Sequence, residues 1–264
     1  MALTHTLGQD GILRIILARP HRLNAVNEEL ARGFAEAAGL TSKGGVRAVL
    51  LAGEGPAFCA GGDVIAMATE TGSGENLTRL AHVINRGLLA LLESSVPVVA
   101  AAHGTTAGGG LGLLLASDYA IVGHNSRIGA LYSNIGLTPD LSVTALLGRA
   151  VGERRALQLL LSDTMLSAQQ AREWGLVAEV VGSAEMTPGE IAAAVRARAE
   201  EVAAAWASGA NGAYGQAKRL VRSRPTRTLA EQLEEEARSI GAAFDTPDAR
   251  SLIQAFAART GARS

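Results

Sequence analysis

The stretch from Pro97 to Asp118 (PVVAAAHGTTAGGGLGLLLASD) constrains the fold of this chain more than any other. An apolar run is followed by a turn and then by three consecutive glycines, Gly108 to Gly110, which open a second apolar segment. This order predicts a buried strand, a loop and a helix that begins with glycines. The first amides of a helix have no partner within it, and glycines let a ligand approach them closely. We therefore expect this helix N-terminus to bind a negatively charged oxygen.

Two common glycine motifs do not fit this stretch. A dinucleotide-binding fingerprint starting at Gly110 fails because Leu115 stands where its third glycine belongs. A phosphate-binding loop fails because no Lys-Ser or Lys-Thr pair follows the glycines. Close packing of a helix against a strand would also explain the glycines, so the pattern alone leaves packing and binding open.

The rest of the chain alternates apolar strand-like runs with amphipathic segments up to about residue 180. From Pro188 onward its pattern is helical. A chain of 264 residues that is 48% hydrophobic can bury a large core. The alternation favours an α/β fold over separate α and β domains. We therefore predict an α/β core over residues 1–187 and a helical region over residues 188–264.

Composition excludes several classes of function. The net charge is −1, with 24 basic and 25 acidic side chains, so we expect neither a nucleic-acid surface nor a polybasic membrane anchor. The five histidines lack metal-ligand spacing, and we predict no metal site. The single cysteine, Cys59, cannot form an internal disulfide and indicates a reducing compartment. We see no signal peptide and no membrane-length apolar run, and expect a cytoplasmic protein.

Two glycine-rich loops, each placed after a predicted strand and before a predicted helix, lie about fifty residues apart. Their sequences are FCAGGD (58–63) and AGGGLG (107–112), and they resemble those of the crotonase superfamily, also called the enoyl-CoA hydratase/isomerase family. Further segments resemble the family in the family's order: RLNAV (22–26), IGLTPD (135–140), ERRALQLLLSDTMLSAQQAREWGLVAEVV (153–181) and DARSLIQAFAAR (248–259). The resemblance covers nearly the whole chain.

This resemblance implies a crotonase-like spiral core of ββα turns, followed by a C-terminal helical region that mediates trimer formation. Trimers of the family commonly pair into hexamers, so we expect a homotrimer or a hexamer. The implied substrate is an acyl-CoA. No separate cofactor is expected, because coenzyme A is part of that substrate.

The resemblance also implies an oxyanion hole, in which the backbone amides of Ala60 and Gly109 bind the thioester oxygen. Fixed N–H donors stabilise the enolate that forms there, each by roughly 3–4 kcal/mol in comparable sites. The RLNAV turn is expected to line the adenine and pantetheine of the substrate. Asp63 would also suit a helix cap, and Tyr132 could either wall the acyl pocket or donate a hydrogen bond. The residues expected to contact the substrate are Arg22, Asn24, Ala25, Val26, Ala60, Gly61, Gly62, Asp63, Val64, Gly108, Gly109 and Tyr132.

The chain departs from the family's hydratases, which place two glutamates over the substrate. Gly112 and Tyr132 stand at those two positions, so addition of water by a glutamate pair is not available. One carboxylate remains near the expected site, Asp140, where several enoyl-CoA isomerases of the family carry their acid/base. A single aspartate whose pKa is raised by an apolar pocket suffices to move a proton between two carbons. Asp140 could instead cap a helix that starts at Leu141.

These observations favour an enoyl-CoA isomerase that uses Asp140. Alternatives are an enoyl-CoA hydratase, an aryl-CoA dehalogenase and a catalytically silent CoA-binding protein. The dehalogenases share an aspartate at this position but also use a tryptophan and a base histidine. Here Tyr132 stands at the place of the tryptophan and Asn85 near that of the histidine, with His82 one helical turn earlier.

Overall fold

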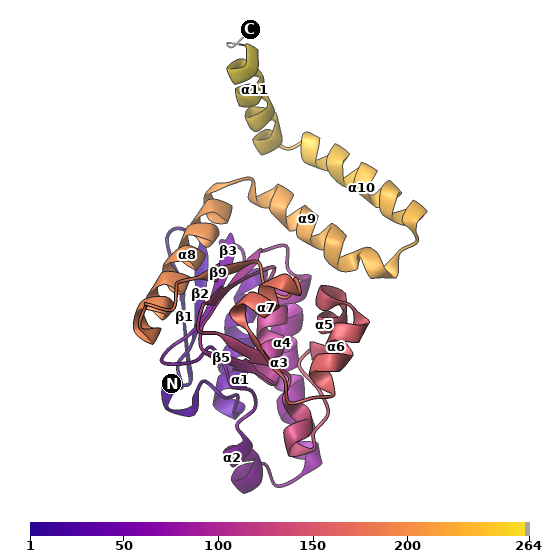
Figure 1. The fold of residues 1–264 in the computed structure, drawn as a ribbon. Coiled ribbons are helices and arrows are strands. Elements are labelled where there is room, and N and C mark those ends of the chain that lie inside the picture. Colours follow the sequence, from indigo (N-terminus) through magenta and orange to yellow (C-terminus); the bar gives the residue numbers. More distant parts are fainter. Residues whose placement is uncertain (262–264) are drawn as a thin grey trace.

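Two β-sheets organise the chain in the computed structural model, which describes residues 1–261 (Figure 1). The larger sheet has the order β1-β2-β3-β4-β6-β9, and it is parallel except for the antiparallel pair β1 and β2. Its strands are β1 (Leu3–Leu7), β2 (Ile12–Leu17), β3 (Ala48–Gly53), β4 (Val98–Ala102), β6 (Tyr119–Gly123) and β9 (Glu179–Val181). The smaller sheet joins β5 (Thr105–Ala107), β7 (Arg127–Gly129) and β8 (Met165–Ser167).

Helices cover both faces of the larger sheet. On one face lie α1 (Glu28–Gly39) and α3 (Gly74–Glu93), which pack against each other, and on the other lies α8 (Pro188–Ser208). Successive residues of β3 point to opposite faces, so Leu51 joins the core beneath α1 and α3, while Leu50 joins the core beneath α8. Burial on both faces explains why the parallel strands are nearly all apolar. The α/β order predicted from the alternating pattern is confirmed.

The remaining elements connect these layers or extend them. Asn27 caps α1 through the Leu30 amide, and Ser167 caps the helix Ala168–Glu173. These elements are the 3₁₀-helices η1 (Pro20–Arg22), η2 (Leu40–Ser42), η4 (Tyr132–Ile135) and η5 (Arg224–Thr226), the short π-helix η3 (Met67–Thr71), and the α-helices α2 (Val64–Ala66), α4 (Gly109–Leu115), α5 (Val143–Val151), α6 (Glu153–Leu160) and α7 (Ala168–Glu173).

The C-terminal helices are α9 (Asn211–Ser223), α10 (Leu229–Phe244) and α11 (Pro247–Gly261). Lys218 links α9 to the core. Its ammonium group donates hydrogen bonds to the carbonyls of Leu91 and Val96 and forms an ion pair with Asp118. Beyond α9, α10 and α11 project away from the two-sheet core (Figure 1). The division at residue 188 stays a prediction, and α8 shares a hydrophobic cluster with the sheet.

The two glycine-rich loops lie side by side where β3 and β4 end. The Cys59 amide donates to the carbonyl of Thr105, and the Ala107 amide donates to the carbonyl of Cys59. A side chain at Gly110 would overlap the carbonyl oxygen of Cys59, so this close approach requires glycine. Parallel strands bring segments that are far apart in sequence to one edge of the sheet, which places both loops at one site.

Candidate active site

A largely apolar cavity of about 440 Å³ opens beside the glycine-rich loops. Its walls come from both loops, from the first half of α3 and from the segment 130–141. The predicted site residues that line it are Val26, Ala60, Gly61, Gly62, Val64, Gly108, Gly109, Tyr132 and Asp140. A mostly apolar cavity with a few converging polar groups is the usual form of a small-molecule site.

The Ala60 amide is not available to a ligand, which corrects the prediction for this residue. It donates to the carbonyl of Leu23 at 2.9 Å. Leu23 reaches it from the RLNAV turn with a left-handed φ of +49°. Ala60 and Leu23 are distant in sequence, so no local sequence signal could have shown this bond.

Among the described residues, the structure shows no such bond for the amide two residues later, that of Gly62. The Gly61 carbonyl accepts from the Val26 amide at 2.7 Å, so the trans peptide points the Gly62 N–H away from Val26. Within residues 1–261, the structure gives no hydrogen-bond acceptor to the amides of Gly62 and Gly109. Both line the cavity, and a Cβ added at Gly108 would lie only 3.4 Å from the Cα of Gly61. Two unsatisfied donors in adjacent loops suit a carbonyl oxygen that gains negative charge.

Asp140 and Tyr132 form a hydrogen-bonded pair in the wall of this cavity. The Tyr132 hydroxyl donates to Asp140 Oδ1 at 2.7 Å. Asp140 is exposed at the rim of the cavity, yet the protein atoms around its carboxyl group desolvate it and raise its pKa, an effect that the Tyr132 bond only partly offsets. Burial and the neighbouring Asp140 raise the pKa of Tyr132, so its hydroxyl stays a neutral donor.

The alternative role of Asp140 as a helix cap is wrong. Helix α5 begins at Val143 rather than at Leu141, and its N-cap is Ser142. Ser142 makes no side-chain cap bond, and the Asp140 carboxylate accepts from Tyr132 instead. The carboxylate is therefore directed at the cavity rather than at the helix.

Asp63 has a structural environment. Its carboxylate accepts from the Ala66 amide, which caps α2, and forms an ion pair with Arg19 at 2.8 Å. The side chains of Asp63 and Arg19 are only 6% and 11% exposed. Burial alone would raise the pKa of Asp63, but the Ala66 and Arg19 bonds together hold it below its ordinary value. The cap that the sequence suggested for Asp63 is confirmed.

Three residues of the RLNAV turn lie away from the cavity. Asn24 is fully buried, and its amide group donates to the carbonyls of Glu54 and Ala57, both at 2.8 Å. Ala25 is buried, whereas Arg22 is exposed. Their predicted contacts with coenzyme A remain predictions. The Asn24 side chain instead stabilises the turn through these two hydrogen bonds.

Cys59 packs in the main hydrophobic core. Burial raises the pKa of its thiol to about 12, so it stays protonated near neutral pH. Among the residues the structure describes, no group of three His, Cys, Asp or Glu side chains could hold a metal ion. No helix of residues 1–261 is long and apolar enough to cross a membrane.

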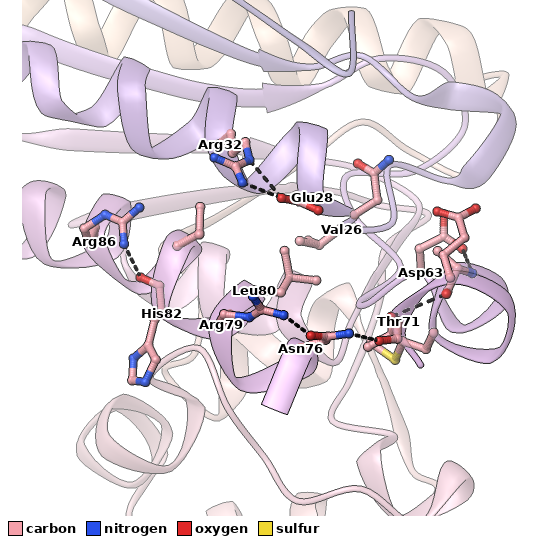
Figure 2. A pocket seen from close by; sticks show the side chains of 15 residues that line it. Val26, Glu28, Arg32, Asp63, Thr71, Asn76, Arg79, Leu80, His82 and Arg86 are labelled. Carbon is pink, nitrogen blue, oxygen red and sulfur yellow. Dashed lines mark hydrogen bonds and ion pairs between the residues drawn. The ribbon is translucent and has the colours of Figure 1, made fainter. Parts of the chain in front are cut away.

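A second, polar groove of about 540 Å³ adjoins the cavity and shares Val26, Met67 and Leu80 with it. Figure 2 shows its arginines bonded to neighbours: Arg32 to Glu28, Arg79 to Asn76 and Arg86 to the carbonyl of His82. No sequence signal marks this groove, because Arg32 on α1 and Arg79 and Arg86 on α3 look like ordinary solvated positions on two helices. His82 lies in this groove, and it does not line the apolar cavity.

Comparisons with known proteins agree with this geometry. The family model described as "Enoyl-CoA hydratase/isomerase" matches residues 8–262. A 1,2-epoxyphenylacetyl-CoA isomerase of Escherichia coli K12 is 31% identical over 254 residues, which cover 95% of this chain and 94% of that protein. A 4-chlorobenzoyl coenzyme A dehalogenase of an Arthrobacter species is 31% identical over 94% of this chain and 87% of its own length. The crystal structure of an enoyl-CoA hydratase from Polaromonas sp. JS666 superimposes with a TM-score of 0.87 at 26% identity, covering 98% of each chain.

Proposed function

Because the chain belongs to the enoyl-CoA hydratase/isomerase family and has the crotonase fold, we propose that it is an enoyl-CoA isomerase with Asp140 as its acid/base. One observation carries the proposal: the Asp140 carboxyl group lies in the same cavity as the unpaired amides of Gly62 and Gly109. The family's members carry out several reactions, since the relatives include an isomerase and a dehalogenase. The choice among these reactions therefore rests on the residues of this cavity.

The proposed reaction moves a double bond from the β,γ to the α,β position of an acyl-CoA. The thioester oxygen accepts from the Gly62 and Gly109 amides. The Asp140 carboxylate removes a proton from the α-carbon, and the electron pair passes into a dienolate whose negative oxygen the two amides stabilise. Asp140 then returns that proton to the γ-carbon. One carboxyl group suffices, because the proton it takes is the proton it gives back.

The apolar walls and Tyr132 set the pKa and the orientation of the Asp140 carboxyl group for this proton transfer. A carboxylate with its ordinary pKa is a weak base towards a carbon acid, and desolvation raises the pKa of Asp140 towards the working pH. The hydrogen bond from Tyr132 occupies Oδ1 and leaves Oδ2 for the substrate. Coenzyme A enters as part of the substrate, so the proposed reaction needs no separate cofactor.

The dehalogenase is the second candidate, favoured by the 31% identity with the Arthrobacter dehalogenase. Within the described residues no histidine lines the cavity, and neither His82 nor Asn85 does so. The hydratase lacks its two glutamates, at Gly112 and Tyr132. Both alternatives are therefore weaker than the isomerase.

The proposed assembly is a homotrimer or a pair of trimers in the cytoplasm. Helices α10 and α11 carry large apolar side chains that are more than half exposed in the single chain, namely Leu233, Ile240, Phe244, Leu252 and Phe256. Exposed apolar faces of this kind are typical of surfaces that bind another protein. We expect light scattering of the full chain to give a multiple of three subunits, and a monomer would contradict this assembly.

A panel of CoA esters tests the proposed reaction. We expect conversion of 3-enoyl-CoA to 2-enoyl-CoA esters, and a loss of about 10²- to 10⁴-fold in Asp140→Asn. The matched control is Asp163→Asn, which changes an exposed aspartate outside the cavity. Full activity of Asp140→Asn would remove Asp140 from the mechanism. Efficient hydration of crotonyl-CoA would favour the hydratase, and chloride release from 4-chlorobenzoyl-CoA would favour the dehalogenase. Binding of acyl-CoA without turnover would favour the catalytically silent protein.

A further inference from the structure

The backbone around Leu141 occupies the space where residue 112 would carry a side chain. Gly112 is buried in α4, and a Cβ added there would overlap the carbonyl oxygen of Leu141. The same Cβ would lie 2.8 Å from the Cβ of Leu141, whereas real Cβ atoms essentially never come closer than 3.0 Å to another atom. The three nearest atoms are the carbonyl oxygen, the carbonyl carbon and the Cβ of Leu141, and a rotamer change moves none of them. The turn from Asp140 to Ser142 therefore lies directly on the side of α4 that Gly112 leaves open.

This turn has a conformation that local preferences oppose. Leu141 and Ser142 have φ values of +47° and +65°, in the left-handed region that residues other than glycine rarely adopt. The Ser142 hydroxyl is buried without a hydrogen-bond partner in the described part of the chain. Strained residues of this kind persist only where surrounding packing imposes them, and they concentrate at functional sites.

Packing of Leu141 against α4 supplies that constraint. Leu141 is only 5% exposed, and it belongs to the main hydrophobic core. Its Cδ2 would lie 3.1 Å from a Cβ added at Gly109, so the side chain rests on the same glycine face of the helix. Leu141 thus packs against the face of α4 that Gly109 and Gly112 form, and Asp140 is the first residue of the turn.

We propose that Gly112 is a positioning residue for Asp140: its missing side chain leaves the space into which the Leu141 turn packs, and the turn in that place aims the Asp140 carboxyl group at Tyr132. The acid/base role of Asp140 itself rests on the proposed function. A direct consequence is that a side chain at position 112 and the observed place of Asp140 exclude each other. A glutamate introduced at 112 displaces Asp140 instead of adding a second carboxylate to the cavity.

The test is Gly112→Ala, read out by carbon-13 NMR titration of the aspartate carboxyl groups. The Asp140 signal is assigned by its loss in Asp140→Asn. The groups that act on this pair are Tyr132 and, behind Tyr132, the buried thiol of Cys59. We expect the pKa of Asp140 to fall towards its ordinary value, because the displaced carboxyl group returns to water. We also expect kcat for isomerisation to fall about 100-fold while KM stays within about twofold, since misplacement by about 1 Å costs this much.

Two further variants keep the test decisive. Gly148→Ala is the matched control, because it adds the same methyl group to α5 where nothing lies within 4 Å, and we expect both readouts to stay unchanged. If Gly112→Ala does not fold, Leu141→Ala decides, since it keeps Gly112 and removes the packing that holds the turn. We expect Leu141→Ala to lower the pKa of Asp140 as well.

The outcomes separate this inference from the proposed function. An unchanged pKa of Asp140 in folded Gly112→Ala, with or without loss of activity, overturns the positioning role, as does an unchanged pKa in Leu141→Ala. A wild-type protein that isomerises no enoyl-CoA ester, but whose Asp140 pKa falls in Gly112→Ala, overturns the function and supports the positioning role.

Discussion

Two aspartates of this chain lie in similar sequence contexts, but their hydrogen-bond partners differ and their pKa values shift in opposite directions. Asp63 and Asp140 each follow a turn-like segment, and each looks like the cap of the next helix. Asp63 is that cap, paired with the buried guanidinium of Arg19, and its pKa is lowered. Asp140 caps nothing, has the neutral hydroxyl of Tyr132 as its partner, and its pKa is raised. The comparison teaches that the partner of a desolvated carboxylate, a cation for Asp63 and a neutral hydroxyl for Asp140, decides whether its pKa falls or rises.

The largest effect that tests this comparison is expected for Asp63→Asn. The variant leaves the Arg19 charge buried without its partner, and breaking a buried pair in this way costs about 3–5 kcal/mol of unfolding free energy. Urea unfolding measures it. Asp10→Asn is the control, because it removes a more exposed ion pair with Arg14 and should cost less than about 1 kcal/mol. Equal losses in the two variants would mean that Asp63 is no more structural than a surface residue.

A smaller effect is expected for Tyr132→Phe. The Tyr132 hydrogen bond lowers the pKa of Asp140, so its removal raises that pKa further, and the acid limb of the pH–rate profile moves to higher pH. We expect kcat to fall roughly tenfold, as suits the loss of a hydrogen bond to a charged group. Tyr214→Phe changes a tyrosine outside the cavity and serves as the control. A limb that stays in place would show that Tyr132 only walls the cavity.

The smallest effect concerns how stability changes with pH, and its sign differs between the two aspartates. The pKa of Asp63 is lowered on folding, so its charge stabilises the fold above its unfolded pKa, and this contribution disappears as pH falls through the folded pKa. The deficit of Asp63→Asn should therefore shrink in acid. The pKa of Asp140 is raised on folding, so its protonated form favours the folded state below the unfolded pKa, and this contribution is lost as pH rises through the folded pKa. Asp140→Asn should then be slightly more stable than wild type near neutral pH and equal to it in acid. Thermal melts across pH measure both trends, and parallel curves would break the comparison.

Much of the fold was predictable from local pattern. Parallel strands covered on both faces need continuous apolar runs, so the positions of β3 and β4 followed from VRAVLLA and PVVAAA. Asn27 and Ser167 each cap the helix that follows them, in keeping with the general preference of Asn and Ser for this position. The helical pattern from Pro188 onward corresponds to α8, α9, α10 and α11. Each of these features depends on residues that are close in sequence, which is why pattern was enough.

The candidate site was predictable in its parts and less so in its details. The two glycine-rich loops and the single remaining carboxylate, Asp140, were found by comparing the motifs with those of the family. Which of the two amides is unpaired, that of Ala60 or that of Gly62, could not be predicted in this way. It depends on the carbonyl of Leu23, which belongs to a turn distant in sequence and accepts from the Ala60 amide. The helix starting at Leu141 was wrong for a similar reason. A leucine ordinarily avoids the left-handed region, whereas Leu141 adopts it where it packs against Gly109 and Gly112.

The sequence by itself determined which groups this protein can use: apolar strands for a two-faced sheet, glycines for free amides, and one carboxylate where a hydratase would have two glutamates. The tertiary structure alone decided which amides are unpaired, which aspartate has a cation beside it and which has only Tyr132. The physical reason is that composition and short-range periodicity act along the chain. Hydrogen-bond satisfaction, desolvation and steric exclusion act across space, between segments that the sequence keeps far apart.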